Sequence, residues 1–444
     1  MTRGMKSQEN EGAMKTKGIV IAGLAGGSGK SVVSVGLTAY LAREGVNVVP
    51  FKKGPDYIDA GWMALAAGRK CYNLDPYLMS EETLLSSFFQ HSRDAEIIVV
   101  EGNRGLYDGV NSSGGYSTAE LAVSLRLPVV LVVNCTKTTR TVAAMVLGCK
   151  KLDERINICG VILNHVATKR QSDLITAAVQ EATGIPVLGI VPRMKKDIFP
   201  MRHLGMIPHQ EYSHSEKALS LLADTFSQSV DIDAVKRVMV EIPPISQKKE
   251  LHGINKKPVD TIRIGVIQDA AFQFYYAENL EALEQEGAEL IPINALKDEA
   301  LPPLDGLYIG GGFPETSAKE LAANAPFRNS MHESIESGLP VYAECGGLIY
   351  LGKSILLDDN EYKLCGIFDV RFGMSVKPQA HGYSIFEVEN ENPFYMAGSI
   401  IKGHEFRYST ILEWNGREEA LALKMKRGTG FMGGRDGLRY KNVL

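Results

Sequence analysis

The chain has 444 residues, of which 45% are hydrophobic and 23% are charged, a composition typical of a globular protein with two or three domains. Its 48 Lys and Arg against 52 Asp and Glu leave a net charge of −4 without long runs of one sign, which argues against a nucleic-acid partner. The apolar runs are shorter than the roughly 18 residues that span a bilayer, and residues 1–17 lack the apolar core of a signal peptide, so we expect a cytoplasmic protein with no membrane partner.

Short apolar runs alternate with helix-length amphipathic stretches from residue 17 onward. The runs are continuous and rich in β-branched residues, which is typical of strands that helices cover on both faces of a parallel sheet. The predicted strands of this part are residues 18–24, 46–51, 96–100, 129–133, 158–163 and 187–191.

This rhythm breaks near residue 242, where prolines and lysines replace the apolar runs. A second series of strands is predicted at 262–267, 289–293, 306–309 and 340–343, with helical stretches between them. We therefore expect an α/β protein with a P-loop doubly wound parallel sheet domain over residues 17–242, a linker over 243–260, and a second α/β domain over 261–444.

The first predicted strand runs into the sequence G-L-A-G-G-S-G-K-S at residues 23–31, followed by a helix over 32–43. Glycine N–H groups, a helix N-terminus, a lysine and a hydroxyl that can face Mg²⁺ together form a phosphate-binding loop. Ala25 stands where partitioning ATPases carry a lysine, which argues against a dimerising switch ATPase. The predicted ATP contacts in this loop are Gly26, Gly27, Gly29, Lys30 and Ser31.

Two further segments follow predicted strands, F-K-K-G-P-D-Y-I-D at residues 51–59 and V-E-G-N-R-G-L-Y-D-G at 100–109. Doubly wound sheets bind ligands at the carboxyl ends of their strands, where both segments lie. They resemble motifs of the cobyrinic acid a,c-diamide synthases, within the dethiobiotin-synthetase-like group. The resemblance implies that Lys52 reaches the γ-phosphate of ATP, and that Mg²⁺ is held by Ser31, Glu101 and one of Asp56 or Asp59.

Asn164 ends a later predicted strand and leaves two interpretations open, an amide that binds adenine, as the resemblance implies, or a turn-forming residue. His203, His209 and His214 fit no metal-ligand spacing, so we interpret them as surface or substrate-cleft histidines.

In the second domain, V-Y-A-E-C-G-G-L at residues 341–348 places Cys345 at a turn between a strand and a helix. Such an elbow presents a nucleophilic sulfur, and the helix dipole is expected to lower its pKa. The N–H groups of Gly346 and of Gly311, in the 310–312 turn, would form an oxyanion hole. His404, in a polar stretch after a strand, is the expected partner of the thiol, and the other five cysteines are expected to be inert.

The segments G-G-F-P-E, E-C-G-G and G-H-E-F-R-Y-S resemble motifs of class I glutamine amidotransferases of the cobyrinate and cobyrate synthase type, which implies a flavodoxin-like α/β domain. Phe406 occupies the usual acidic position, so Glu405 is the candidate to orient His404, and Arg407 replaces a frequent histidine. Relatives generally continue through a final strand ending in H-x-H, so we expect a frayed edge and reduced activity here if the chain is truncated.

The two resemblances together imply an enzyme of cobalamin biosynthesis that amidates the a and c side-chain carboxylates of cobyrinate, a corrin polycarboxylate, using ATP, Mg²⁺ and ammonia released from glutamine by Cys345. A nickel-sirohydrochlorin a,c-diamide synthase is the nearest alternative, and a non-enzymatic nucleotide switch is an alternative of another class. The order of amidation stays open, and so does the oligomeric state, for which a homodimer is one expectation.

Overall fold

The computed structural model describes residues 16–193, 201–202, 205–242 and 261–444. The chain divides into two compact units, Met1–Lys248 and Lys249–Leu444, each with its own hydrophobic core. The boundaries 17–242 and 261–444 stay predictions, and the predicted linker at 243–260 lies outside the described residues. None of the helices in the described part of the chain combines the length and the apolar character that a bilayer crossing requires.

The first unit is built on one sheet in the order β3-β2-β4-β1-β5-β6-β7, in which all these neighbours are parallel, and β10 pairs antiparallel with β1. The doubly wound parallel sheet predicted from the sequence is therefore confirmed. Strand β1 lies between β4 and β5, which places the loop after β1 where such sheets bind ligands. The strands are β1 (Lys17–Gly23), β2 (Val48–Lys53), β3 (Tyr72–Leu74), β4 (Ile97–Glu101), β5 (Val129–Asn134), β6 (Ile158–Val166), β7 (Val187–Pro192) and β10 (Val240–Glu241), and β8 (Met201–Arg202) pairs with β9 (Gly205–Met206).

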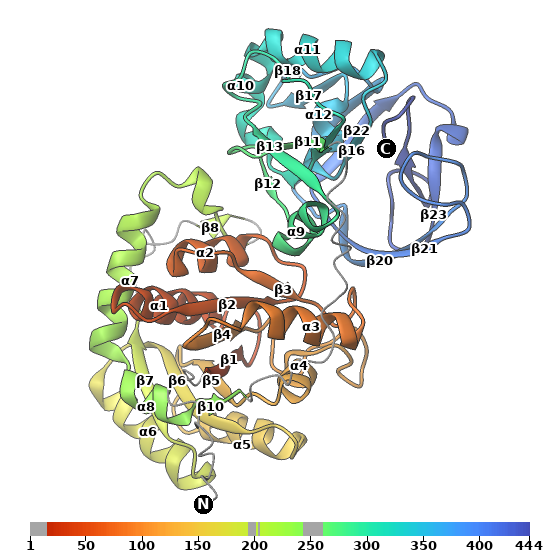
Figure 1. The fold of residues 1–444 in the computed structure, drawn as a ribbon. Helices are drawn as coiled ribbons and strands as arrows, with labels where there is room; N and C mark the ends of the chain where they lie inside the picture. The colour runs from red at the N-terminus through yellow and green to blue at the C-terminus, as the bar shows by residue number, and fades with distance from the viewer. Residues whose placement is uncertain (1–15, 194–200, 203–204, 243–260) are drawn as a thin grey trace, which may run out of the picture. The chain divides into compact units, whose positions relative to one another are not determined.

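Helices surround this sheet (Figure 1). Helix α1 packs so closely on α7 that a Cβ on Gly36 would lie 2.4 Å from the Phe226 ring, so only glycine fits there. Helix α3 begins where the Ser80 hydroxyl accepts a hydrogen bond from the Thr83 N–H, a standard N-cap. The helices are α1 (Lys30–Arg43), α2 (Ile58–Ala67), α3 (Glu81–His91), α4 (Thr118–Leu125), α5 (Thr141–Leu152), α6 (Lys169–Thr183), η1 (His209–Glu211), α7 (Ser215–Ser229) and α8 (Ile232–Val238).

The second unit contains a parallel sheet in the order β13-β11-β14-β16, which matches the second series of predicted strands. Strands β12 and β15 form a separate short antiparallel pair, although α9, β13 and β14 lie between them in the chain. The elements are β11 (Ile262–Ile267), β12 (Phe272–Phe274), α9 (Ala277–Gln285), β13 (Ala288–Ile293), β14 (Gly306–Ile309), β15 (Gly311–Gly312), η2 (Pro314–Ser317), α10 (Ala318–Ala323), α11 (Ala325–Glu336), β16 (Val341–Ala343) and α12 (Gly346–Leu351).

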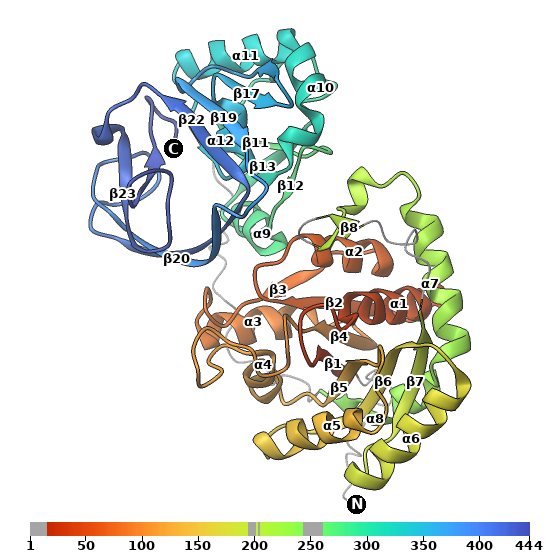
Figure 2. The ribbon, with the colours of Figure 1, turned by 180° about the vertical axis from the view of Figure 1, so that it is seen from behind.

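Two further four-stranded sheets follow, β18-β17-β19-β22 and β21-β20-β23-β24, which the sequence pattern did not predict. Their strands are half-exposed and carry polar residues, so they lack the continuous apolar runs of the parallel strands. Figures 1 and 2 show β20 and β23 on the side of this unit opposite to α10. The strands are β17 (Ser354–Leu357), β18 (Asn360–Lys363), β19 (Val370–Met374), β20 (Ala380–Val388), β21 (Ile400–Arg407), β22 (Ser409–Trp414), β23 (Leu421–Arg427) and β24 (Arg435–Leu438), with η3 (Glu418–Ala420) before β23.

The last residues of the chain are held against β16 rather than frayed. The N–H groups of Val341 and Ala343 donate to the carbonyls of Asn442 and Leu444, and the Leu444 N–H donates back to the Val341 carbonyl. Val443 and Leu444 are also buried. The structure therefore does not show the frayed edge expected from the sequence.

Candidate functional site

The loop between β1 and α1 has the open glycine backbone of a phosphate cradle. Gly27 and Gly29 have φ values of +75° and +91°, which L residues rarely adopt. No atom lies within 4 Å of a Cβ placed on Gly26 or Gly27, so the space beside both glycines is open. The Ser28 hydroxyl closes the loop, because it accepts from the Ala25 N–H and donates to the Ala25 carbonyl.

Asn164 reaches this loop from β6. Its side-chain amide donates to the Ser28 carbonyl at 3.0 Å, and its Oδ1 accepts from the N–H of His165. A Cβ on Gly29 would lie 1.9 Å from the Asn164 Nδ2, so the asparagine and the glycine fit only together. Asn164 thus braces the phosphate loop, while the contact with adenine stays a prediction.

Lys30 is the first residue of α1 and is only 7% exposed. Its ammonium lies 3.4 Å from the Ala25 carbonyl. Burial and the positive charge of Lys52 lower the pKa of Lys30, although Glu101 and Asp59 oppose that shift. A phosphate anion in the loop would stabilise the charged form of this lysine.

Four side chains, from the starts of α1 and α2 and the ends of β2 and β4, meet beside the loop. The Ser31 hydroxyl lies 2.8 Å from Glu101 Oε1 and 3.0 Å from Asp59 Oδ2. The Lys52 ammonium lies 2.8 Å from the same Asp59 oxygen and 3.0 Å from the same Glu101 oxygen, and it also donates to the Gly102 carbonyl. We call Ser31, Lys52, Asp59 and Glu101 the carboxylate cluster.

Two members of the carboxylate cluster are buried, with Lys52 1% exposed and Glu101 0% exposed, while Ser31 and Asp59 are half-buried. Although burial opposes it, the charges of Asp59 and Glu101 raise the pKa of Lys52, which stays an ammonium. Burial acts against the charged form of Asp59 too, but Lys52 lowers the pKa of that carboxyl below its ordinary value. Burial, together with the charge of Asp59, raises the pKa of Glu101 to about 7.

Asp56, the other predicted metal ligand, has a different position. Its Oδ1 accepts from the N–H groups of Ile58 and Asp59 at the start of α2, as a capping carboxylate does. The structure therefore brings Asp59, and not Asp56, to the Ser31 hydroxyl. Among the described residues there is no group of three or more His, Cys, Asp or Glu side chains placed to hold a metal by themselves.

Cys345 lies in the second unit, between the end of β16 and the start of α12. Its φ of 49° and ψ of −103° are strained for a residue with a side chain, which is the backbone signature of a nucleophile elbow. A Cβ on Gly346 would lie 3.0 Å from the Gly312 N, and one on Gly311 would lie 3.4 Å from the Cys345 Cβ. The structure thus brings the two predicted oxyanion-hole glycines next to the thiol.

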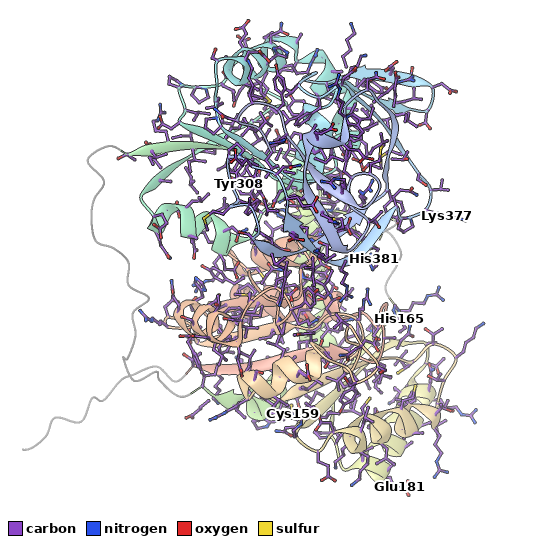
Figure 3. All side chains as sticks on the ribbon, turned by 90° about the vertical axis from the view of Figure 1, so that its right-hand side faces the viewer. Cys159, His165, Glu181, Tyr308, Lys377 and His381 are labelled. Carbon is purple, nitrogen blue, oxygen red and sulfur yellow. The ribbon has the colours of Figure 1, made fainter. Side chains whose placement is uncertain are left out.

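The expected lowering of the thiol pKa is wrong for this structure. Cys345 is exposed as a residue, yet loss of water around the sulfur and the charge of Glu315 raise its pKa to about 11. Helix α12 has only six residues, so its dipole is short, and the Gly346 N–H offsets the carboxylates only in part. Burial raises the pKa of Cys159, labelled in Figure 3, to about 12, as expected for an inert thiol.

His404 lies within β21, opposite Tyr383 on β20, and not after a strand as the sequence suggested. Its ring centroid is 6.3 Å from that of Tyr276. The prediction that Glu405 orients His404 is wrong. Successive side chains of a strand point to opposite faces, and the Glu405 carboxylate accepts from the N–H groups of Thr429 and Gly430.

Two residues of the second unit make contacts that the sequence did not predict. Arg407 donates to the carbonyls of Ser409 and Gly430, so it fixes the same turn as Glu405. Tyr275 donates to the Ile267 carbonyl and accepts from the Gly310 N–H, directly before the oxyanion-hole glycines. Only the tertiary structure shows the contacts of Arg407 with Gly430 and of Tyr275 with Gly310, because the partners lie 23 and 35 residues apart in the chain.

Of the three histidines singled out in the first unit, the structure describes His209 and His214. His203 lies outside the described residues. The His209 ring packs edge-on against Trp62, and burial lowers its pKa. Their interpretation as surface or cleft histidines stays a prediction.

Comparison with known proteins matches each of the two units to a described domain family. Residues 19–204 match the CobQ/CobB/MinD/ParA nucleotide binding domain, and residues 263–444 match the CobB/CobQ-like glutamine amidotransferase domain. Among solved structures, chloroplast FtsY from Physcomitrella patens aligns over 44% of this chain and 64% of its own, at 16% identity and a TM-score of 0.31, which is too low to bear on the fold.

Several relatives match nearly the whole chain and are named cobyrinate a,c-diamide synthase. The protein from Archaeoglobus fulgidus is 39% identical, over 96% of this chain and 92% of its own length. The protein from Magnetococcus marinus is 38% identical over 94% and 90%, and that from Dehalococcoides mccartyi is 40% identical over 88% and 86%. With both domains matched and this identity over nearly the full length, the chain belongs to the cobyrinate a,c-diamide synthase family.

Proposed function

We propose that this chain amidates the a and c side-chain carboxylates of cobyrinate with ammonia from glutamine at the expense of ATP. Membership of the family makes the chain a glutamine-dependent amidotransferase ligase, so a non-enzymatic switch is not proposed. One observation carries the proposal. A strained cysteine elbow and a phosphate loop occur in one chain that relatives named cobyrinate a,c-diamide synthase match over 96% of its length.

The nucleotide site activates the substrate carboxylate by phosphorylation. A carboxylate oxygen attacks the γ-phosphorus of ATP, which gives an acyl phosphate and ADP. Ammonia then attacks the acyl carbon, inorganic phosphate leaves with the former carboxylate oxygen, and an amide remains. The loop N–H groups and the ammonium of Lys30 would stabilise charge on the phosphoryl oxygens during the first step.

The carboxylate cluster fits a Mg²⁺ ion. The Oε2 atom of Glu101 is buried and has no hydrogen-bond partner, so one carboxylate oxygen is available as a ligand. Ser31, Asp59 and Glu101 supply the oxygen donors that Mg²⁺ takes alongside phosphate oxygens and water. When bound, the ion would supply positive charge to the β- and γ-phosphates. Lys52 holds the two carboxylates close together and lowers the pKa of Asp59. The γ-phosphate contact predicted for Lys52 belongs to this proposal.

The cysteine site supplies ammonia. The thiolate of Cys345 attacks the side-chain amide carbon of glutamine, ammonia leaves, and water hydrolyses the resulting thioester to glutamate. Because the pKa of the thiol is about 11, it is protonated at neutral pH and needs a base when glutamine binds. We assign that role to His404, and the role of oxyanion donors to the N–H groups of Gly311 and Gly346.

The test is an assay with ATP, Mg²⁺, glutamine and one of three substrates, namely cobyrinate, hydrogenobyrinate and nickel-sirohydrochlorin, with products identified by mass spectrometry. Double amidation of cobyrinate in preference to the other two is expected. Nothing in the structure or the relatives favours nickel-sirohydrochlorin. Its preferential amidation would overturn the substrate assignment while leaving the reaction class intact.

The cytoplasmic location and a homodimer stay predictions within this proposal. ATP and glutamine are abundant in the cytoplasm, which supports the first. Fractionation of cells and light scattering of the purified protein test the two predictions separately.

A further inference from the structure

Tyr275 ties three segments of the second unit together. The residue follows β12, and its hydroxyl donates to the carbonyl of Ile267 at 2.5 Å, at the end of β11. The same hydroxyl accepts from the N–H of Gly310 at 2.7 Å. The ring packs edge-on against Tyr308, labelled in Figure 3, with centroids 5.0 Å apart. One phenol therefore links the end of β11 to the residue before β15.

Strand β15 consists of the two glycines beside the thiol. It pairs antiparallel with β12, with Phe272 opposite Gly312 and Phe274 opposite Gly311, and the register shifts between them. A two-residue strand beside an irregular register has few bonds of its own, so its position depends on its ends. The Tyr275 hydroxyl holds the end at Gly310.

The other side of the site has a separate anchor. The Glu344 N–H donates to the carbonyl of Ile309 at 2.9 Å, which fixes the residue before Cys345 against the end of β14. Gly310 lies between that bond and β15. Two bonds therefore help to fix the Gly311 N–H relative to the Gly346 N–H, one at the Ile309 carbonyl and one at the Tyr275 hydroxyl.

We propose that Tyr275 is a positioning residue for glutamine hydrolysis, because its hydroxyl holds the Gly310–Gly312 segment where an N–H can stabilise the oxyanion that forms on the glutamine amide oxygen when Cys345 attacks. This inference rests on the proposed glutaminase function of Cys345. Oxyanion donors act through their preorganised placement, so loosening a donor costs the tetrahedral intermediate more stabilisation than it costs bound glutamine.

Tyr275→Phe removes only the hydroxyl and keeps the ring against Tyr308. Loss of a whole oxyanion donor costs on the order of 10²–10³ in rate, so a displaced donor should lower kcat of glutamine hydrolysis about tenfold, with KM within about twofold. Tyr395→Phe is the matched control. The Tyr395 hydroxyl is another phenol hydroxyl of the same unit, and it hydrogen-bonds to the Tyr342 hydroxyl rather than to the segment beside β15. Its removal should leave the rate of glutamine hydrolysis unchanged.

Two further measurements separate positioning from general damage. Inhibition by an aldehyde analogue of glutamine, which forms a tetrahedral adduct with the thiol, should weaken about tenfold in Tyr275→Phe. Alkylation of Cys345 by iodoacetamide forms no oxyanion and should keep its wild-type rate. Should Tyr275→Phe not fold, Gly310→Ala tests the same bond, because its Cβ would lie 2.6 Å from the Tyr275 Cζ.

The outcomes are distinguishable. A wild-type protein that releases no ammonia from glutamine would overturn the proposed function of Cys345. An active wild type with unchanged kcat in Tyr275→Phe, or a variant in which alkylation slows as much as hydrolysis, would overturn the positioning role alone.

Discussion

Glu101→Gln tests the nucleotide half of the mechanism most directly. The side chain is 0% exposed, and its Oε1 accepts from both Ser31 and Lys52. Glutamine has nearly the same shape, and its Oε1 can keep both hydrogen bonds. The substitution therefore removes a negative charge and a metal-binding oxygen, while the arrangement of the carboxylate cluster is retained.

The expected loss of synthesis is large. Removing one preorganised electrostatic contact costs on the order of 3–4 kcal/mol, or roughly 10²–10³ in rate, with either glutamine or ammonium as nitrogen source. The cost in folding is smaller. The new amide nitrogen would occupy the place of Oε2, which has no partner, and a buried unsatisfied donor costs about 1–3 kcal/mol.

The pH dependence of stability gives a second, independent signature. Burial raises the pKa of Glu101 from 4.5 to about 7, so the folded protein binds this proton more tightly than the unfolded chain. The free energy of unfolding of the wild type should therefore fall as the pH rises from about 4.5 through about 7, because the folded protein loses its tightly bound proton. Glu101→Gln has no such proton, so its free energy of unfolding should not show this decrease.

The assay is ammonium-driven synthesis over a Mg²⁺ titration, with glutaminase activity as the internal control. Asp56→Asn is the matched comparison, because that carboxylate caps α2 and should matter less than Asp59→Asn. A Glu101→Gln protein with near wild-type synthesis and unchanged Mg²⁺ dependence would refute the metal-binding role of Glu101.

Four further predictions concern the other site residues. Cys345→Ser should abolish glutamine-dependent synthesis and spare ammonium-dependent synthesis; loss of both in a folded protein would contradict the division of labour. His404→Ala should lower glutaminase activity at least tenfold, while Glu405→Gln should lower stability more than rate, as denaturation and initial-rate measurements can decide. The rate of Cys345 alkylation in the free enzyme should rise about tenfold per pH unit between pH 7 and 10, because the pKa of the thiol is about 11. A rate that reaches its plateau below pH 8 would refute that pKa. Asn164→Ala should weaken nucleotide binding, measured by calorimetry, because the Ser28 carbonyl loses its donor.

The sequence by itself determined the parts of this protein that local patterns encode. The central residues of β1, β4 and β5 form continuous apolar runs because helices cover both faces of a parallel sheet, so this pattern predicts both the strands and the parallel topology. The phosphate loop and the elbow at Cys345 were equally readable, because each is a short turn whose glycines and reactive side chain are neighbours in the chain.

Only the tertiary structure decided which distant side chains meet. At the start of α2, the Asp59 carboxylate contacts the Ser31 hydroxyl, whereas the Asp56 carboxylate accepts from backbone N–H groups of the helix. The tertiary structure also directs the Glu405 carboxylate to the turn at Gly430. The sequence did not predict this orientation, because the mixed polar pattern of β21 does not reveal that the segment is a strand. Charge and burial around Cys345 come from segments remote in the chain, which is why its pKa is raised where the local helix dipole alone predicted the opposite.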